Sequence, residues 1–381
     1  MSDSRETAAN WRKESLMPGS KVIAHKLRDA RTPREAAPPG EKRDYHWIQT
    51  HDPWASQLIA FTSLLYEPGE GLVYCGLTSM NADLLYTFDP GTGAFKSLRY
   101  NQVEGSERYD VKIHRSLVQD DDGTIYGATA GLHPHDLRLQ APGGKVFLVE
   151  PKSKRIELLG IPVPYDYVQT IALDKRRKVI YCNTYPVWQM AMFDIKTRQS
   201  VYLGIGSLGH RAFCDWDGNV WGSFDDSRRL FKYNPEDGFI KFDASLPKMN
   251  GSPVNWGVAI AAPDERAIYM GTAGGGLWRM DPDTAETTYL GKPLADDRIE
   301  GLVFGKDGLL YGAGGWHETG LFAYDRESRR LHDLGPIFDS ELNERCVIPH
   351  DMCITDDGTI YTGETDNSDR SCYLWECRVK L

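Results

Sequence analysis

Short apolar runs recur along the chain, each preceded by a polar turn and each carrying one aromatic residue at a fixed place. Their sequences are GEGLVYCG, DDGTIYGA, RRKVIYCN, WDGNVWGS, DERAIYMG, KDGLLYGA and DDGTIYTG. The marker aromatics, which follow one another at intervals of 40 to 55 residues, are Tyr74, Tyr126, Tyr181, Trp221, Tyr269, Tyr311 and Tyr361. A period of this length made of short strands is typical of a four-stranded propeller blade. The pattern predicts an all-β fold, a seven-bladed β-propeller.

Each marker is expected in the second strand of its blade, with one apolar strand before it and two after it. The third strands, such as LLYTFDP, KVFLVEP and GLFAYD, are apolar and rich in aromatics, as sheets packed between neighbouring sheets require. The sequence ends at Leu381, directly after the third strand of the last repeat. Residues 21–27 have strand character, and we expect them to complete that blade and close the ring.

One propeller domain is expected over residues 20–381, because repeats build one continuous assembly. Residues 1–19 are interpreted as a polar tail and residues 28–56 as an irregular connector that crosses the propeller. Seven cysteines at irregular spacing give no disulfide framework.

Composition excludes some partners and locations. The net charge of −10 and the pI near 5.5 argue against nucleic-acid binding, which depends on Lys and Arg. No run approaches the roughly 18 consecutive apolar residues of a membrane helix, so no membrane partner is expected. The first thirty residues lack the apolar core of a signal peptide, which favours a cytoplasmic protein.

The repeat also locates the strand that lines the central channel of each blade. Counting back eleven residues from each marker leads to Ser63, Arg115, Thr170, His210, Val258, Glu300 and His350. His114 precedes Arg115, and Arg211 follows His210. Because His titrates near neutrality and can move a proton, a ring of these residues at the channel entrance is competent for acid–base chemistry. The arginines add a positive pocket to an acidic chain.

Loops after the second strands extend over the same entrance and supply further candidates. Their histidines are His133, His135 and His317, and their aromatic residues are Tyr185, Trp188 and Trp316. Tyr167 precedes the third inner strand, and Trp256 begins the fifth. The tryptophans offer flat faces for a sugar ring, although each also suits packing between blades. The same ring supplies the candidate ligands of a divalent metal, Ca or Zn, in the channel: His210, Glu300 and His350.

The chain resembles the seven-bladed propeller polysaccharide lyases, which include the ulvan and rhamnose–glucuronate lyases. The resemblance rests on the repeat, on the segment His114-Arg115-Ser116-Leu117 followed by DDGTIYGATAGLHPH, and on the closing GETDNSDRSCYLWE. It implies cleavage of an acidic oligo- or polysaccharide at C4 of a uronic acid by β-elimination.

Elimination needs a base, an acid and a group that neutralises the carboxylate. The resemblance implies the following candidates: His114 or His133 as the base, Tyr185 or Tyr167 as the acid, and Arg115 or Arg211 with His210 at the carboxylate. His135, Trp188, Trp256, Trp316 and His317 are the further candidates for substrate binding.

Three other functions are compatible with the sequence. A metal-dependent propeller lactonase or hydrolase would hold its metal with carboxylates, which are scarce at the channel positions. A non-catalytic interaction scaffold would not need titrating groups at the channel entrance. A streptogramin-type lyase would share the elimination chemistry.

Overall fold

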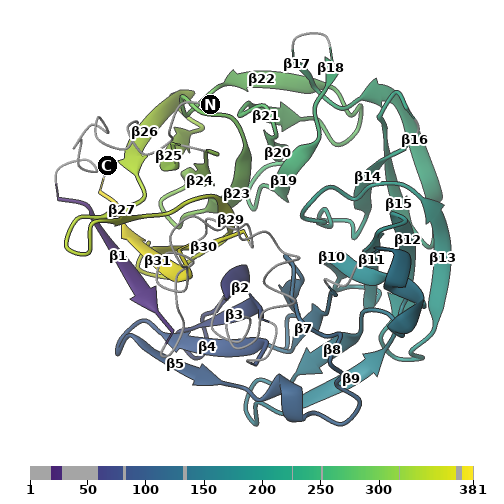
Figure 1. Cartoon of the computed structure of the whole chain (residues 1–381). Helices are drawn as coiled ribbons and strands as arrows, with labels where there is room; N and C mark the ends of the chain where they lie inside the picture. The colour runs from purple at the N-terminus through teal and green to yellow at the C-terminus, as the bar shows by residue number, and fades with distance from the viewer. Residues whose placement is uncertain are drawn as a thin grey trace.

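The computed structural model describes residues 19–27, 59–79, 83–131, 135–224, 226–249, 252–316, 318–365 and 371–380. Seven antiparallel sheets stand around a central axis as the blades of a propeller (Figure 1). The predicted seven-bladed β-propeller is therefore confirmed. Within the described ranges no helix is long and apolar enough to span a membrane.

The blades follow one another along the chain, each with its inner strand first except the fourth, whose inner segment pairs with β14 through the isolated bridge between Cys214 and Val220. The first three are β2 (Ala60–Glu67), β3 (Leu72–Thr78), β4 (Leu85–Asp89), β5 (Ala94–Ser97); β6 (Leu117–Gln119), β7 (Ile125–Ala128), β8 (Val146–Val149), β9 (Ile156–Gly160); and β10 (Tyr167–Asp174), β11 (Val179–Tyr185), β12 (Gln189–Asp194), β13 (Ser200–Ile205). The fourth is a three-stranded sheet, β14 (Val220–Phe224), β15 (Arg229–Asn234), β16 (Gly238–Ser245). The fifth and sixth are β19 (Trp256–Ala261), β20 (Ile268–Thr272), β21 (Leu277–Met280), β22 (Thr287–Gly291); and β23 (Ile299–Phe304), β24 (Leu310–Gly314), β25 (Gly320–Asp325), β26 (Arg330–Pro336). The seventh is β29 (Pro349–Ile354), β30 (Ile360–Glu364), β31 (Tyr373–Arg378) and β1 (Lys21–Lys26).

Short elements decorate the connections between blades. Two hairpins, β17 (Lys248–Met249) with β18 (Ser252–Pro253) and β27 (Phe338–Asp339) with β28 (Glu344–Arg345), lie outside the blades. Two 3₁₀ helices, η3 (Tyr100–Gln102) and η4 (His135–Gln140), occupy loops of the first two repeats.

The core is divided among the blade interfaces. Seven clusters of buried apolar side chains each join two neighbouring blades, and every marker aromatic belongs to one of them. Tyr74, Trp221 and Tyr361, for example, are at most 1 % exposed. The markers recur because every interface needs a large side chain at the same height of the second strand.

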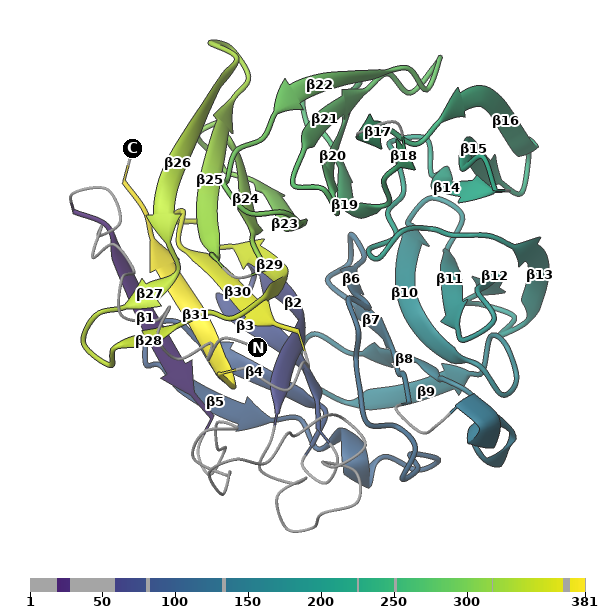
Figure 2. The same cartoon turned by 45° about the horizontal axis from the view of Figure 1, so that its top comes forward.

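The N-terminal segment closes the ring as predicted. Strand β1 pairs antiparallel with β31, from Lys21 opposite Arg378 to Lys26 opposite Tyr373 (Figure 2). His25 Nε2 lies 2.8 Å from Glu376 Oε2, and the Ala24 amide donates to Asp339 Oδ2 at 2.9 Å. The predicted tail, residues 1–19, and connector, residues 28–56, lie almost entirely outside the described residues.

Five inner strands share an irregularity at the end where they begin. Their pairing with the second strand shifts register between Phe61 and Ser63, Val168 and Thr170, Trp256 and Val258, Ile299 and Gly301, and Pro349 and Met352. Such β-bulges leave a residue outside the ladder and turn its side chain in a new direction. The repeated bulges thus form a ring at one entrance of the channel.

All seven cysteines are free, as the sequence predicted, and all but Cys214 are buried. Burial raises the pKa of the Cys182 thiol. These thiols therefore act as small core side chains rather than as nucleophiles.

Candidate active site at the channel entrance

Arg115 lies at the centre of the ring of bulges. Its backbone has φ 47°, and its side chain is fully buried. The guanidinium donates from Nε to His350 Nδ1 at 3.0 Å, from Nη1 to the carbonyl of Gly257 at 2.8 Å and from Nη2 to Glu300 Oε2. Three other blades are therefore tied to one side chain of the second blade. Such a pattern needs the planar fork of an arginine.

Backbone contacts between blades hold Arg115 in this position. Its amide donates to the carbonyl of Thr62 at 3.0 Å. Its carbonyl accepts from Thr170 Oγ1 at 3.3 Å, and the same hydroxyl accepts from the Ala212 amide at 2.9 Å. The first four blades are thus linked in sequence around the entrance.

Glu300 is the carboxylate that balances this cationic centre. Arg298 Nε lies 2.7 Å from Glu300 Oε1, and His210 Nδ1 lies 3.7 Å from Oε2. Burial by itself would raise the pKa of Glu300, but Arg115, His210 and Arg298 hold it well below its usual value. Glu300 is therefore an anion throughout the neutral range.

The two buried histidines have defined hydrogen-bonding roles. His350 Nδ1 accepts from Arg115, so its proton resides on Nε2. Burial lowers the pKa of His350 well below its usual value, and the charge of Arg115 acts in the same direction. His114 Nδ1 lies 2.6 Å from the carbonyl of Gln169, to which it must donate. The His114 and His350 rings meet edge to face, with centroids 4.5 Å apart.

His210 differs from both because its side chain is 41 % exposed. Its Nδ1 lies near Glu300 at an ion-pair distance that is longer than a hydrogen bond, and the tautomer with the proton on Nδ1 leaves the lone pair on Nε2. A carboxylate beside an imidazole fixes the tautomer and stabilises the imidazolium that forms when the ring takes a proton. His210 is therefore the histidine of the ring best suited to remove a proton from a bound molecule.

Arg211 is separated from this centre. Its Nη1 pairs with Asp351 Oδ1, while Asp351 Oδ2 accepts from the Leu64 amide at 2.9 Å. Arg115 or Arg211 was expected to neutralise a substrate carboxylate. In the structure all three nitrogens of the Arg115 guanidinium are already hydrogen-bonded within the protein, so Arg115 positions the other groups.

Aromatic side chains gather on the rim beside the ring. Tyr167 and Tyr185 pair across β10 and β11 with ring centroids 5.2 Å apart, and Trp188 meets Tyr185 edge to face at 5.5 Å. On the sixth blade Trp316 is 47 % exposed, and the Arg298 guanidinium lies 4.9 Å from its ring centroid. Both places offer aromatic surface to a ligand.

Several predicted residues lie elsewhere or outside the description. Trp256 is 2 % exposed and packs in the core between the fourth and fifth blades, so it offers no face to a ligand, in contrast to the prediction. His133 and His317 lie outside the described residues. His135 begins η4, but its side chain also lies outside the description. Their assigned roles stay predictions.

The residues expected to hold a metal come together, but their donors are engaged. Glu300 Oε2 and His350 Nδ1 both accept from Arg115, whose cationic guanidinium lies between them. Over the described ranges no group of three His, Cys, Asp or Glu side chains has the arrangement of a metal site. As arranged, these residues do not fit a metal ion, and we derive no step through one. Metal binding by this chain stays a prediction.

Two parts of the site were not anticipated. Arg298 precedes β23 with φ 76°, one position outside the strand that the repeat locates. The second is the backbone carbonyl of Gly257, whose contact with Arg115 does not depend on a side chain and so could not be predicted from the residue type. Both residues lie at or next to the β-bulge at the start of an inner strand, so a search that included the neighbours of each expected strand start would have found them.

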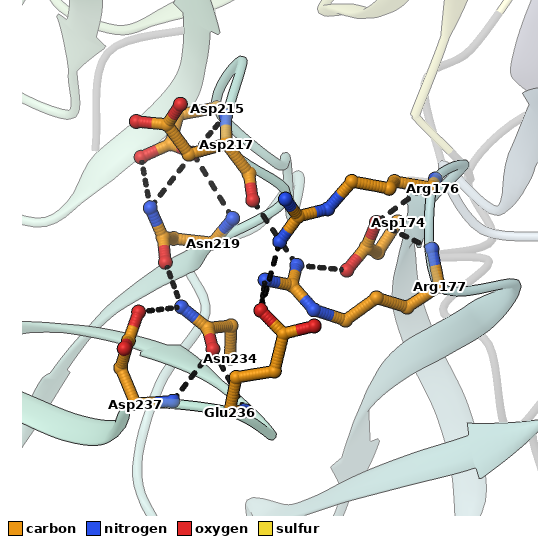
Figure 3. A network of polar contacts seen from close by, with 9 residues as sticks. All are labelled: Asp174, Arg176, Arg177, Asp215, Asp217, Asn219, Asn234, Glu236 and Asp237. Carbon is orange, nitrogen blue, oxygen red and sulfur yellow. Dashed lines mark hydrogen bonds and ion pairs between the residues drawn. The ribbon is translucent and has the colours of Figure 1, made fainter.

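A further polar network joins the third and fourth blades (Figure 3). Arg177 pairs with Asp174 at 2.7 Å and with Glu236 at 2.8 Å. Asp215 accepts from the Trp221 indole at 2.8 Å and from Asn219. Arg177 and Asp215 lie in the turns that follow inner segments, and Glu236 lies in the turn between β15 and β16, all at the opposite end from Arg115. The network ties turns of adjacent blades together and has a structural role.

Comparisons with known proteins show the fold alone. A solved streptogramin B lyase has 12 % sequence identity and a TM-score of 0.65, covering 95 % of this chain and 98 % of its own. A virginiamycin B lyase from Staphylococcus aureus has 13 % identity and a TM-score of 0.62, covering 95 % of this chain and 100 % of its own. No family model and no curated protein matches the sequence. The likeness shows the seven-bladed propeller fold, and none of these comparisons supports the resemblance to the polysaccharide lyase family.

Proposed function

We propose that the chain is a carbon–oxygen lyase that acts at the channel entrance. The observation that carries this proposal is the position of the partly exposed His210 beside Glu300. Glu300 is buried, and Arg115 holds its carboxylate in place. A base of this kind, next to cationic groups, suits removal of a proton from a carbon adjacent to a carbonyl. The solved lyases of the same fold support the reaction class.

In the proposed reaction His210 takes the proton from the carbon next to a carboxylate or ester carbonyl. The electron pair of the C–H bond forms a carbon–carbon double bond, and the C–O bond on the next carbon breaks. Arg298, which pairs with the other oxygen of Glu300, stabilises the negative charge that develops on the carbonyl oxygen. Tyr167, on the strand that carries Gln169, gives the proton to the leaving oxygen.

The proposed substrate is an acidic oligosaccharide that contains a uronic acid. Arg115 and Arg298 carry two positive charges against the single negative charge of Glu300, so an anion is favoured at the entrance. Trp316 and the pair Tyr185–Trp188 provide faces for sugar rings. Quinupristin is the second candidate, since a structure of a virginiamycin B lyase variant with quinupristin shares the fold at a TM-score of 0.64.

The test is to incubate the protein with a panel of uronate glycans and with quinupristin and to follow the ultraviolet absorbance of an unsaturated product. His210→Ala is expected to abolish the product while the unfolding temperature stays near that of the parent. His332→Ala is the matched control, because His332 lies on β26, away from the channel entrance, and this variant should keep full activity.

Mass spectrometry of the products separates elimination from hydrolysis, because hydrolysis adds one water. Products heavier by one water would show that the protein is a hydrolase and not a lyase. Activity that survives His210→Ala would remove His210 from the reaction, and a complete lack of turnover across the panel would contradict the proposal.

A further inference from the structure

The central channel contains a cavity below the ring of bulges. Its volume is about 260 Å³, just under the lower end of the range of small-molecule sites. Inner strands or inner segments of five successive blades, the second to the sixth, line it. Phe213, Ile260 and Val303 are among the lining residues and are only partly buried.

The wall of this cavity is largely apolar. All of its lining residues except Gln119, Lys175 and Arg211 are apolar. Apolar side chains that remain accessible in a cavity favour a ligand with apolar surface, because burial of that surface away from water contributes binding free energy.

The charged residues of the wall are both cations. Among the residues that the structure places around the cavity, Lys175 and Arg211 carry charge and none is acidic. This is notable in a chain with a net charge of −10. Each cation has a carboxylate partner outside the wall, Asp121 at 2.9 Å from Lys175 and Asp351 beside Arg211, so the wall offers an anion N–H donors rather than an unbalanced positive charge.

The two cations lie at different depths. Lys175 belongs to the turn after β10, at the open end, and its side chain is 49 % exposed. Arg211 lies next to His210, at the level where the inner strands begin, and its side chain is 26 % exposed. One guanidinium nitrogen of Arg211 pairs with Asp351. An arginine has five N–H donors, so this pairing leaves donors for an oxyanion.

We propose that this cavity binds an amphiphilic carboxylate, a molecule with an unbranched apolar body and one terminal carboxyl group. The carboxylate contacts Arg211 at the inner end, and the apolar body lies against Phe213, Ile260 and Val303. Lys175 adds attraction at the open end. The site is distinct from the entrance where His210 and Glu300 lie, and the proposal does not rest on the proposed lyase activity.

Isothermal titration calorimetry of the full chain with decanoate tests the proposal. Saturable binding of one decanoate per chain is expected, and decanol should bind at least about tenfold more weakly because it lacks the charge. Val303→Trp fills the cavity and should remove binding while the unfolding temperature and circular dichroism spectrum are retained.

A charge reversal gives a variant whose folding is not at risk. Lys175→Glu lies on the surface and should weaken decanoate binding roughly fivefold. Lys306→Glu is the matched control: Lys306 is also exposed and also pairs with an aspartate, at 2.8 Å, but it does not line the cavity, so affinity should not change.

The proposal is overturned by any of three results. These are the absence of saturable binding, equal affinities for decanoate and decanol, or equal weakening by Lys175→Glu and Lys306→Glu. If Val303→Trp does not fold, the two lysine variants still decide the question.

Discussion

At the scale of single residues, Arg115 and Glu300 show how a charge can be buried at the centre of a propeller. Each is at most 2 % exposed, and each engages more than one partner. A buried pair adds little by itself, because both groups lose hydration, but loss of either partner leaves an uncompensated charge. The pair therefore fixes geometry more than it contributes stability.

Glu300→Gln is expected to lower the free energy of unfolding at neutral pH by about 3–5 kcal/mol, because Arg115 and Arg298 lose their buried counter-ion. The pKa of Glu300 is held below its unfolded value, so its contribution is present above about pH 4.3 and declines as the pH falls below it. Denaturant unfolding across this range should show the difference between parent and variant shrinking in acid.

Glu236, whose side chain is 63 % exposed and which pairs with Arg176 and Arg177, provides the comparison. Glu236→Gln should cause a much smaller loss, because solvent screens the Glu236 carboxylate and Arg177 keeps Asp174 as a partner. A Glu300→Gln variant as stable as Glu236→Gln would contradict the role given to the buried pair.

At the scale of strands, the repeated bulge is what the sequence could not reveal directly. Counting back from the marker aromatics located Arg115, His210, Glu300 and His350, because turn and strand lengths are nearly constant between repeats. Arg298 was missed, since a bulge changes which neighbouring residues face the channel without changing the apolar pattern. The sequence could not show whether Trp256 faces the channel entrance or packs between blades, because tryptophans in both positions occur in the same apolar pattern.

Gly257 shows how closely the bulges approach one another. A Cβ atom at this position would lie 2.5 Å from the carbonyl oxygen of Ile299 and 2.7 Å from Glu300 Cδ. Gly257→Ala should therefore displace Glu300, lower stability by about 1–3 kcal/mol and reduce any activity that depends on His210.

Gly91→Ala is the matched substitution in an exposed turn, where the nearest atom, Asp89 Oδ1, is 3.3 Å from the added Cβ. Thermal unfolding of the two variants should separate them clearly. Equal unfolding temperatures would mean that the backbone at Gly257 yields without disturbing its neighbours.

At the scale of the whole molecule, the ring depends on one strand from the far end of the sequence. Strand β1 covers the outer edge of β31, and buried Glu376 receives His25 from β1 and Tyr361 from β30. Burial alone would raise the pKa of Glu376, but His25 and Arg378 lower it, so the carboxylate stays ionised as their partner.

Removal of residues 1–26 should expose the edge of β31 and cause association that increases with protein concentration, because an open strand edge pairs with other chains. Analytical ultracentrifugation measures this. A peptide of residues 19–27 added in excess should reverse the association by occupying the edge.

The same peptide with Val22→Asp and Ala24→Asp is the control, because both side chains are buried against β31 and its neighbours. A truncated chain that stays monomeric at all concentrations would show that β1 is not needed to protect the edge.

The pairing of β1 with β31 also determines how the molecule responds to force. The first residue of β1 lies opposite the last residue of β31, and the Lys380 amide donates to Ser20 Oγ at 3.0 Å, so both strands leave the ladder at the same end. Tension applied between residues 19 and 380 would load the hydrogen bonds of this pair one after another rather than together. The propeller is therefore mechanically weak along this direction, and it would open as a zipper at its seventh blade while the other six remain folded.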